Sequence, residues 1–130
     1  MLRGDPFMEP ERIILQKKLE ALLGDHGLLR DAAARRVYSL DSSHLKLGRP
    51  WLVALPETPA QLAQVVALCA EARVPIVCRG SGTGLSGGAV PNEGALVLGT
   101  ARMNSAMNVS AGDRTIRVQA GILNEKVSTL

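Results

Sequence analysis

The stretch PIVCRGSGTGLSGGAVP, residues 75–91, constrains this chain more than any other part of its sequence. Five of the ten residues from Arg79 to Gly88 are glycine. Glycine loses more backbone freedom on folding than any other residue, so this density needs a reason. A bound ligand supplies one, because glycine accepts positive φ and lets backbone N–H groups approach a ligand closely.

The chemistry of the loop points to an anion. It follows the apolar run PIVCR directly, and successive N–H groups in such a loop form an anion-binding nest. Ser81, Thr83 and Ser86 add hydroxyl donors, and Arg79 adds a permanent charge at the entrance. We therefore predict a phosphate or pyrophosphate ligand. The alternative is a plain glycine-rich surface turn. Three features disfavour it: the strand before the loop, the proline after it, and Leu85 inside it.

Two familiar phosphate loops do not fit this stretch. Gly82, Gly84 and Gly87 satisfy the spacing GxGxxG, but a dinucleotide-binding loop of that type must run into a helix. Here the chain continues as GAVPNEG, which cannot be helical, and the next apolar run, ALVLGTAR, contains no acidic residue. A Walker A loop needs Gly-Lys-Ser/Thr, and no lysine occurs between Lys46 and Lys126.

Helices and strands alternate in the predicted structure. Residues 9–24 predict a helix with Pro10 in its first turn and Gly24 as its C-terminal cap. Its apolar stripe comprises Ile14, Leu15, Leu19, Leu22 and Leu23. Asp31 predicts the cap of a second, short helix. The capping box TPAQ predicts a third helix from residue 59 to about residue 73.

Strands are predicted at residues 51–56, 75–79, 94–99 and 114–121, with the turn SAGD before the last of them. The first two strands and the helix between them form a βαβ unit, so the strands should be parallel. A final helix is predicted to begin near residue 122, capped by Asn124. A third and fourth strand with nothing after them would leave sheet edges uncovered, so we expect the chain to be part of something longer.

Composition excludes several other functions. The chain has 130 residues and a net charge of +3, with scattered basic residues and no basic run interleaved with aromatics, so we predict no nucleic-acid binding. It has no apolar run of the roughly 20 residues that a membrane span needs, and no secretory signal, so we predict a cytoplasmic location without a transmembrane segment.

Cys69 and Cys78 lack a metal-ligand or CxxC spacing, so we predict two buried reduced thiols and no metal site. His26 and His44 fall in polar turns, and we assign neither a catalytic role.

The loop resembles the pyrophosphate loop of the FAD-linked oxidases of the vanillyl-alcohol oxidase and p-cresol methylhydroxylase type. Within that superfamily it resembles the branch of the glycolate oxidase FAD-linked subunit and the D-lactate dehydrogenases. Four further stretches follow the same order and spacing as in that branch: YSLDSS, VALPETPAQLAQVVALCAEARVPIV, LVLGTARMN and TIRVQAGI. The resemblance covers roughly residues 20–130.

The resemblance implies an α+β fold, the N-terminal part of a p-cresol methylhydroxylase-type FAD-binding domain. We expect a small, mainly parallel sheet with flanking helices and an incomplete second subdomain. Residues 1–45 would form an N-terminal helical segment, and residues 46–130 the N-terminal part of the FAD-binding domain. The implied FAD-binding residues are Pro56, Arg79, Gly80, Ser81, Gly82, Thr83, Gly84, Ser86, Gly87, Gly88, Ala120 and Gly121.

Further expectations follow from the same resemblance. Several relatives attach the flavin covalently through a histidine of this loop, where this chain has Thr83, so we expect non-covalent FAD. The implied reaction is the oxidation of a 2-hydroxy acid by hydride transfer to the flavin, with an iron–sulfur or other electron-transfer subunit as a candidate partner. Catalytic residues would lie beyond residue 130, and the chain alone is expected to be inactive. Two alternatives stay open: a truncated, non-catalytic nucleotide-binding fragment, and an FAD enzyme with other chemistry, such as an enolpyruvyl reductase.

Overall fold

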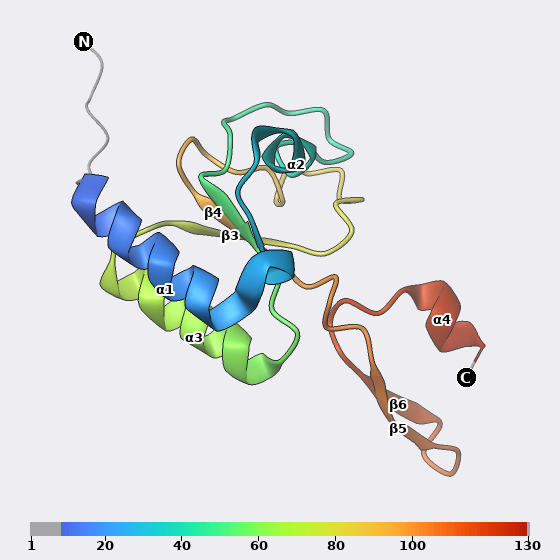
Figure 1. Ribbon diagram of the computed structural model, residues 1–130. Coiled ribbons are helices and arrows are strands. Elements are labelled where there is room, and N and C mark those ends of the chain that lie inside the picture. Colours follow the sequence, from blue (N-terminus) through green and yellow to red (C-terminus); the bar gives the residue numbers. More distant parts are fainter. Residues whose placement is uncertain (1–8, 130) are drawn as a thin grey trace.

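A computed structural model describes residues 9–129 of the chain (Figure 1). The elements in chain order are α1 (Glu9–Gly27), β1 (Leu28–Leu29), α2 (Ala32–Val37), β2 (Leu52–Ala54), α3 (Pro59–Glu71), β3 (Ile76–Arg79), β4 (Leu96–Gly99), β5 (Ala106–Ser110), β6 (Thr115–Val118) and α4 (Asn124–Ser128). They form a main sheet covered by helices and, separately, a hairpin followed by a short helix.

The main sheet has the strand order β1-β2-β4-β3. β4 is parallel to both of its neighbours, with Val97 opposite Val53 on one side and Val77 on the other. β1 is antiparallel to β2. The predicted parallel βαβ unit is therefore confirmed, with β4 inserted between its two strands.

Alternation along the central strands explains the layers. Leu52, Leu96 and Leu98 face one way and belong to the core cluster that α1 and α3 cover. Val53 and Val97 face the other way and pack with Leu55 against Leu29 and Tyr38. All residues of β2 and β4 are buried, as expected for parallel strands covered on both faces.

The two long helices lie side by side on one face of the sheet (Figure 1). In α1 the predicted stripe is largely confirmed, since Leu15, Leu19 and Leu23 are buried, but Ile14 is 56% exposed. Gly24 adopts φ 68° and interrupts the helix, as a cap would, yet a further turn continues to Gly27. Residues 9–29 thus share the core of the sheet, and the domain boundary at residue 45 stays a prediction.

Local capping signals explain where the shorter helices begin. The Asp31 side chain accepts a hydrogen bond from the Ala34 N–H at 2.8 Å, which confirms the predicted cap of α2. Thr58 Oγ1 accepts one from the Gln61 N–H at 3.1 Å and caps α3. In a capping box the Gln61 side chain would accept from the N–H of the cap residue, Thr58. Here Gln61 Oε1 accepts instead from the N–H of Glu57, one residue earlier.

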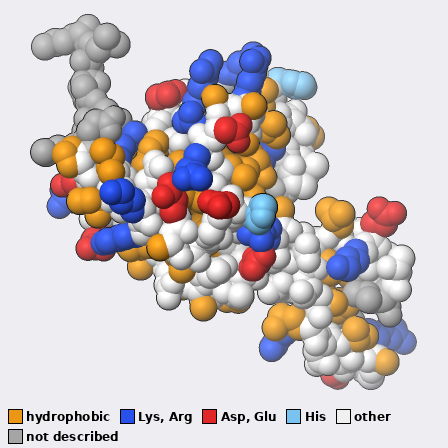
Figure 2. Space-filling view, in the orientation of Figure 1, with side chains coloured by type: hydrophobic (Ala, Val, Ile, Leu, Met, Phe, Trp, Pro, Cys, Tyr) orange, Lys and Arg blue, Asp and Glu red, His pale blue; other side chains and the backbone are white. Residues whose placement is uncertain are grey.

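The C-terminal part corrects two predictions. The fourth strand exists, but it pairs antiparallel with β5 in a separate sheet, and β5 was not predicted. Asn124 does not cap α4: it is already the first helical residue, and Leu123 precedes it with no side-chain acceptor. The side chains of Met107, Val109 and Leu123 are more than half exposed, and Figure 2 shows hydrophobic atoms over this part of the molecule.

The cysteines correct a third prediction. Both thiols are free, and Cys69 is buried, which raises its pKa to about 11 because burial disfavours the charged thiolate. Cys78, however, is exposed. Its strand, β3, lies at the edge of the sheet, where side chains are covered less completely than on the central strands.

Candidate functional site

The candidate site lies at the carboxyl edge of the main sheet. Because β2, β4 and β3 are parallel, their carboxyl ends meet at one edge, where Arg79 pairs with Gly99. The glycine loop, residues 80–88, follows β3 at this edge, and the buried Pro56 follows β2. Ligands of open parallel sheets bind outside such carboxyl ends.

The glycines of the loop fall into two groups. Gly82 and Gly87 both have φ +77°, and a side chain at either would meet protein atoms. A Cβ at Gly82 would collide with the Arg79 guanidinium, and one at Gly87 would lie 2.5 Å from Leu45 Cδ1. These two glycines are therefore needed by the fold of the loop itself.

Gly80, Gly84 and Gly88 form the second group, because a Cβ at any of them would have no atom within 4 Å. Nothing in the described part of the protein explains why these positions lack a side chain. Within residues 9–129, no backbone N–H of the loop 80–88 donates to another protein group. The loop therefore combines backbone N–H groups that have no protein acceptor within residues 9–129 with three positions at which no side chain fills the space, as an anion-binding nest would.

The hydroxyl groups predicted for the site lie in this loop. Ser81, Thr83 and Ser86 are exposed, and Ser81 Oγ lies 3.3 Å from Thr83 Oγ1. Residues 72–92 contain no aspartate or glutamate, so the loop itself presents donors and no carboxylate. This donor set fits a pyrophosphate.

The segment that supports the loop, residues 38–45, was not predicted. Residues 38–45 run against it: the Ser42 N–H donates to the Gly82 carbonyl at 3.1 Å, and Leu45 meets Gly87. Asp41 Oδ1 accepts from the Ser43 N–H at 2.8 Å and also from the Ser43 hydroxyl. The hydrogen bonds from Ser43, and the nearby positive charge of Arg79, lower the pKa of Asp41. The only signal in the sequence was the motif YSLDSS, which carries no local indication of what it touches.

Ala120 and Gly121 also lie near this edge. The Gly121 N–H donates to the Met103 carbonyl at 2.8 Å, and a Cβ at Gly121 would overlap the Thr100 carbonyl oxygen. Glycine is thus required here by a backbone contact with the turn that follows β4. Ala120 is exposed beside it.

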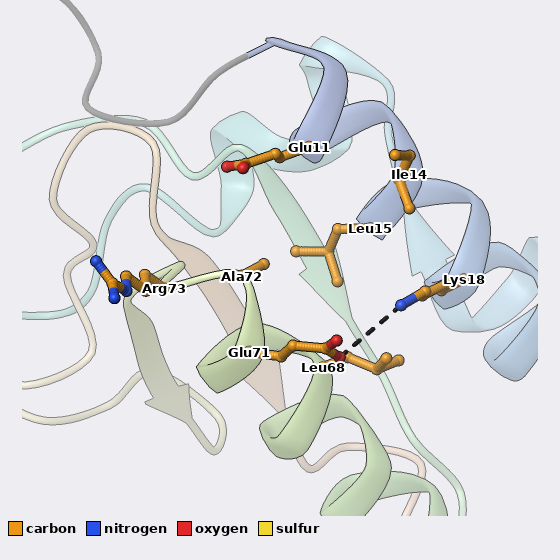
Figure 3. A pocket seen from close by; sticks show the side chains of 8 residues that line it. All are labelled: Glu11, Ile14, Leu15, Lys18, Leu68, Glu71, Ala72 and Arg73. Carbon is orange, nitrogen blue, oxygen red and sulfur yellow. Dashed lines mark ion pairs between the residues drawn. The ribbon is translucent and has the colours of Figure 1, made fainter.

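A groove between α1 and α3 lies at the opposite, amino end of the sheet (Figure 3). It has a volume of about 460 Å³ and is lined by Glu11, Ile14, Leu15, Lys18, Leu68, Glu71, Ala72 and Arg73. Lys18 Nζ and Glu71 Oε2 lie 3.8 Å apart across it. It contains no residue of the glycine loop and is separate from the candidate site.

The described part of the chain offers few other groups that could form a catalytic or metal-binding site. Within residues 9–129, no group of three or more His, Cys, Asp and Glu side chains could hold a metal ion. His26 and His44 are exposed. None of the helices in that range combines the length and hydrophobicity that a membrane span requires.

Comparisons with known proteins identify a family and relatives of this chain. Residues 50–130 match the family model described as FAD binding domain. The chain is 41% identical over 91 residues to the glycolate oxidase subunit GlcD of Escherichia coli K12, covering 70% of this chain and 18% of that protein. It is 35% identical over 119 residues to the D-2-hydroxyglutarate dehydrogenase of Xanthomonas citri pv. viticola, covering 92% of this chain and 24% of that protein.

Solved structures show the same fold. The crystal structure of p-cresol methylhydroxylase with substrate bound superposes with a TM-score of 0.85 at 22% identity, over 95% of this chain and 25% of that chain. The alkyldihydroxyacetonephosphate synthase gives a TM-score of 0.81 at 22% identity, over 99% of this chain and 26% of that one. The predicted fold class is thereby confirmed. The chain spans between 18% and 24% of the length of these two curated relatives.

Proposed function

Because this chain belongs to the FAD binding domain family, we propose that its glycine loop holds the pyrophosphate of FAD at the carboxyl edge of β2, β4 and β3. FAD is the cofactor of this domain. One observation carries the assignment of the loop: its N–H groups donate to no protein group within residues 9–129, while three of its glycines face open space.

The proposed cofactor contacts follow the chain. The backbone of residues 79–84 lines the pyrophosphate together with the hydroxyls of Ser81 and Thr83, and Ser86, Gly87 and Gly88 continue toward the ribityl chain and the flavin. Pro56 lies toward the adenine, and Ala120 and Gly121 approach the cofactor from the turn after β6. Thr83 has no nitrogen with which to link the flavin as a histidine would, so we propose that FAD is bound non-covalently.

The reaction proposed for the whole protein is the oxidation of a 2-hydroxy acid. The relatives named as a glycolate oxidase subunit and a D-2-hydroxyglutarate dehydrogenase support this substrate class. Bound FAD supplies the hydride acceptor. The residues of this chain bind and orient that cofactor, and we assign them no proton transfer. An electron-transfer subunit, a cytoplasmic location and the inactivity of the chain alone stay predictions.

The loop is best tested at Gly84 in the intact protein. A bulky residue at Gly82 would collide with Arg79 before it met any ligand, whereas Gly84 has open space around it. Gly84→Val should therefore leave the fold intact and block the approach of the pyrophosphate. We expect FAD affinity, measured by quenching of flavin fluorescence, to fall by at least about tenfold.

Gly112 provides the matched control, because it also has no atom near its Cβ position but lies in the β5–β6 turn. Gly112→Val should leave FAD affinity unchanged. Equal FAD affinity in the wild type, Gly84→Val and Gly112→Val would mean that the loop is only a turn. An affinity for ADP equal to that for FAD would instead favour the non-catalytic nucleotide-binding alternative.

A further inference from the structure

The side chain of Arg79 turns toward the supporting segment. Its Nη1 donates to the Leu40 carbonyl at 2.5 Å, and its guanidinium lies over the Tyr38 ring, 5.3 Å from the ring centroid. A charged hydrogen bond and a cation–π contact thus hold this one group. The charge at the loop entrance is already engaged with protein.

Tyr38 connects this contact to the core of the sheet. Its ring packs against the cluster of Val53, Leu55 and Val97 and is only partly exposed. The edge of the ring lies 3.8 Å from the Cβ position of Gly99, at the end of β4. The guanidinium therefore rests on a ring that is itself packed against the buried central strands.

On its other side, the guanidinium fills the space beside Gly82. Nη2 and Cζ of Arg79 occupy the position that a side chain at Gly82 would need. The Gly82 carbonyl in turn accepts from the Ser42 N–H. Gly82, which has a left-handed backbone conformation, is thus held both by this hydrogen bond and by the packing of Arg79. Other contacts that hold the loop lie at its far end, where Leu45 packs against Gly87 and the Val90 N–H donates to the Gly87 carbonyl.

We propose that Arg79 is a positioning residue that presets the loop, and that its guanidinium does not contact the phosphate. The inference rests on the proposed function. Stacked on Tyr38 and bonded to Leu40, the guanidinium holds Gly82 so that the loop N–H groups converge before FAD arrives. When only a fraction of the molecules carries a competent loop, the apparent affinity falls by that fraction. The pair of Arg79 and Tyr38 keeps the fraction high.

Four variants of the intact protein separate positioning from direct phosphate contact. Lysine keeps a charge but lacks the planar fork of arginine, so Arg79→Lys and Arg79→Met should both weaken FAD binding by about tenfold. Tyr38→Leu, which keeps an apolar side chain but removes the π face, should do the same, although it leaves Arg79 in place. Tyr38→Phe should retain full affinity, because phenylalanine keeps the ring.

A direct phosphate ligand gives the opposite pattern. Arg79→Lys would then retain affinity, and Tyr38→Leu would have no effect. If both single variants weaken binding and their losses add in the double variant, the two residues act separately. Any of these results overturns the inference. Positioning predicts that Arg79→Met combined with Tyr38→Leu binds FAD no more weakly than either single variant, because both remove the same contact.

A measurement without ligand keeps the two proposals apart. The Ser42 N–H depends on the Gly82 carbonyl, so its hydrogen exchange in FAD-free protein reports whether the loop is held. We expect faster exchange in Arg79→Met and Tyr38→Leu than in the wild type, and no change in Tyr38→Phe. Unchanged exchange in Arg79→Met overturns the inference whether or not FAD binds. Faster exchange in a protein whose wild type binds no FAD leaves the inference standing and overturns the proposed function.

Discussion

At the scale of single residues, the loop glycines differ in what they do for stability. Gly82 and Gly87 have positive φ and close neighbours, whereas Gly80 and Gly88 have neither. We expect Gly82→Ala and Gly87→Ala to lower the free energy of unfolding by roughly 1–3 kcal/mol. Gly80→Ala and Gly88→Ala should change it by less than about 0.5 kcal/mol. Urea denaturation of the four variants checks this, and equal losses at all four positions would contradict the division.

The two cysteines differ in the same way, by their surroundings. Cys69 is buried with its pKa raised to about 11, so at neutral pH it stays protonated and shielded. Cys78 is exposed at the edge strand. An alkylating reagent at neutral pH should therefore modify Cys78 alone in the folded protein, and both thiols after denaturation. Mass spectrometry of the peptides identifies the site, and rapid labelling of Cys69 in the folded state would be the contrary result.

At the scale of elements, the start of α3 depends on one side chain. Thr58 Oγ1 caps the helix that carries Val65 and Cys69 into the core. Thr58→Ala should lower the free energy of unfolding by about 1 kcal/mol, because it leaves a terminal N–H without a partner. Thr58→Ser keeps the acceptor and serves as the control. A thermal melt in which alanine and serine behave alike would show that the cap contributes nothing measurable.

The segment 38–45 should respond to acid through Asp41. Its pKa is lowered in the folded protein by the hydrogen bonds from Ser43, so the ionised form stabilises the fold at neutral pH. That contribution is present above the ordinary aspartate pKa and is lost as the pH falls through the lowered one. Asp41→Asn should therefore flatten the fall in melting temperature below about pH 4 relative to the wild type. Parallel curves for the two proteins would show that Asp41 does not couple folding to pH.

At the scale of the whole molecule, what the sequence could predict was local. The cap at Asp31, the TPAQ box and the turn SAGD each specify themselves within a few residues, and the Ser110 hydroxyl does donate to Asp113 in that turn, at 2.7 Å. The edge position of Cys78 and the contact of Arg79 with Tyr38 depend on chain segments far apart, and no local pattern records them. β5 was missed because only its pairing with β6 makes it a strand. The loop was recognisable by composition, but which of its glycines face the protein depends on contacts in space, such as that of Gly87 with Leu45.

The difference in burial between the main sheet and the hairpin predicts which part of the 130-residue chain unfolds locally first. β2 and β4 are buried on both faces under α1, α3 and Tyr38. Among the described strands, β5 and β6 pair only with each other, and they leave Met107 and Val109 exposed. An isolated two-stranded hairpin is marginally stable in water. We therefore expect amide hydrogen exchange in β5 and β6 to be faster than in β2 and β4 by at least about tenfold. Mass spectrometry of peptides spanning 52–54, 96–99 and 106–118 gives the comparison. Equal protection in all three would mean that the hairpin folds as one cooperative unit with the main sheet, through the contact of Gly121 with Thr100 and Met103.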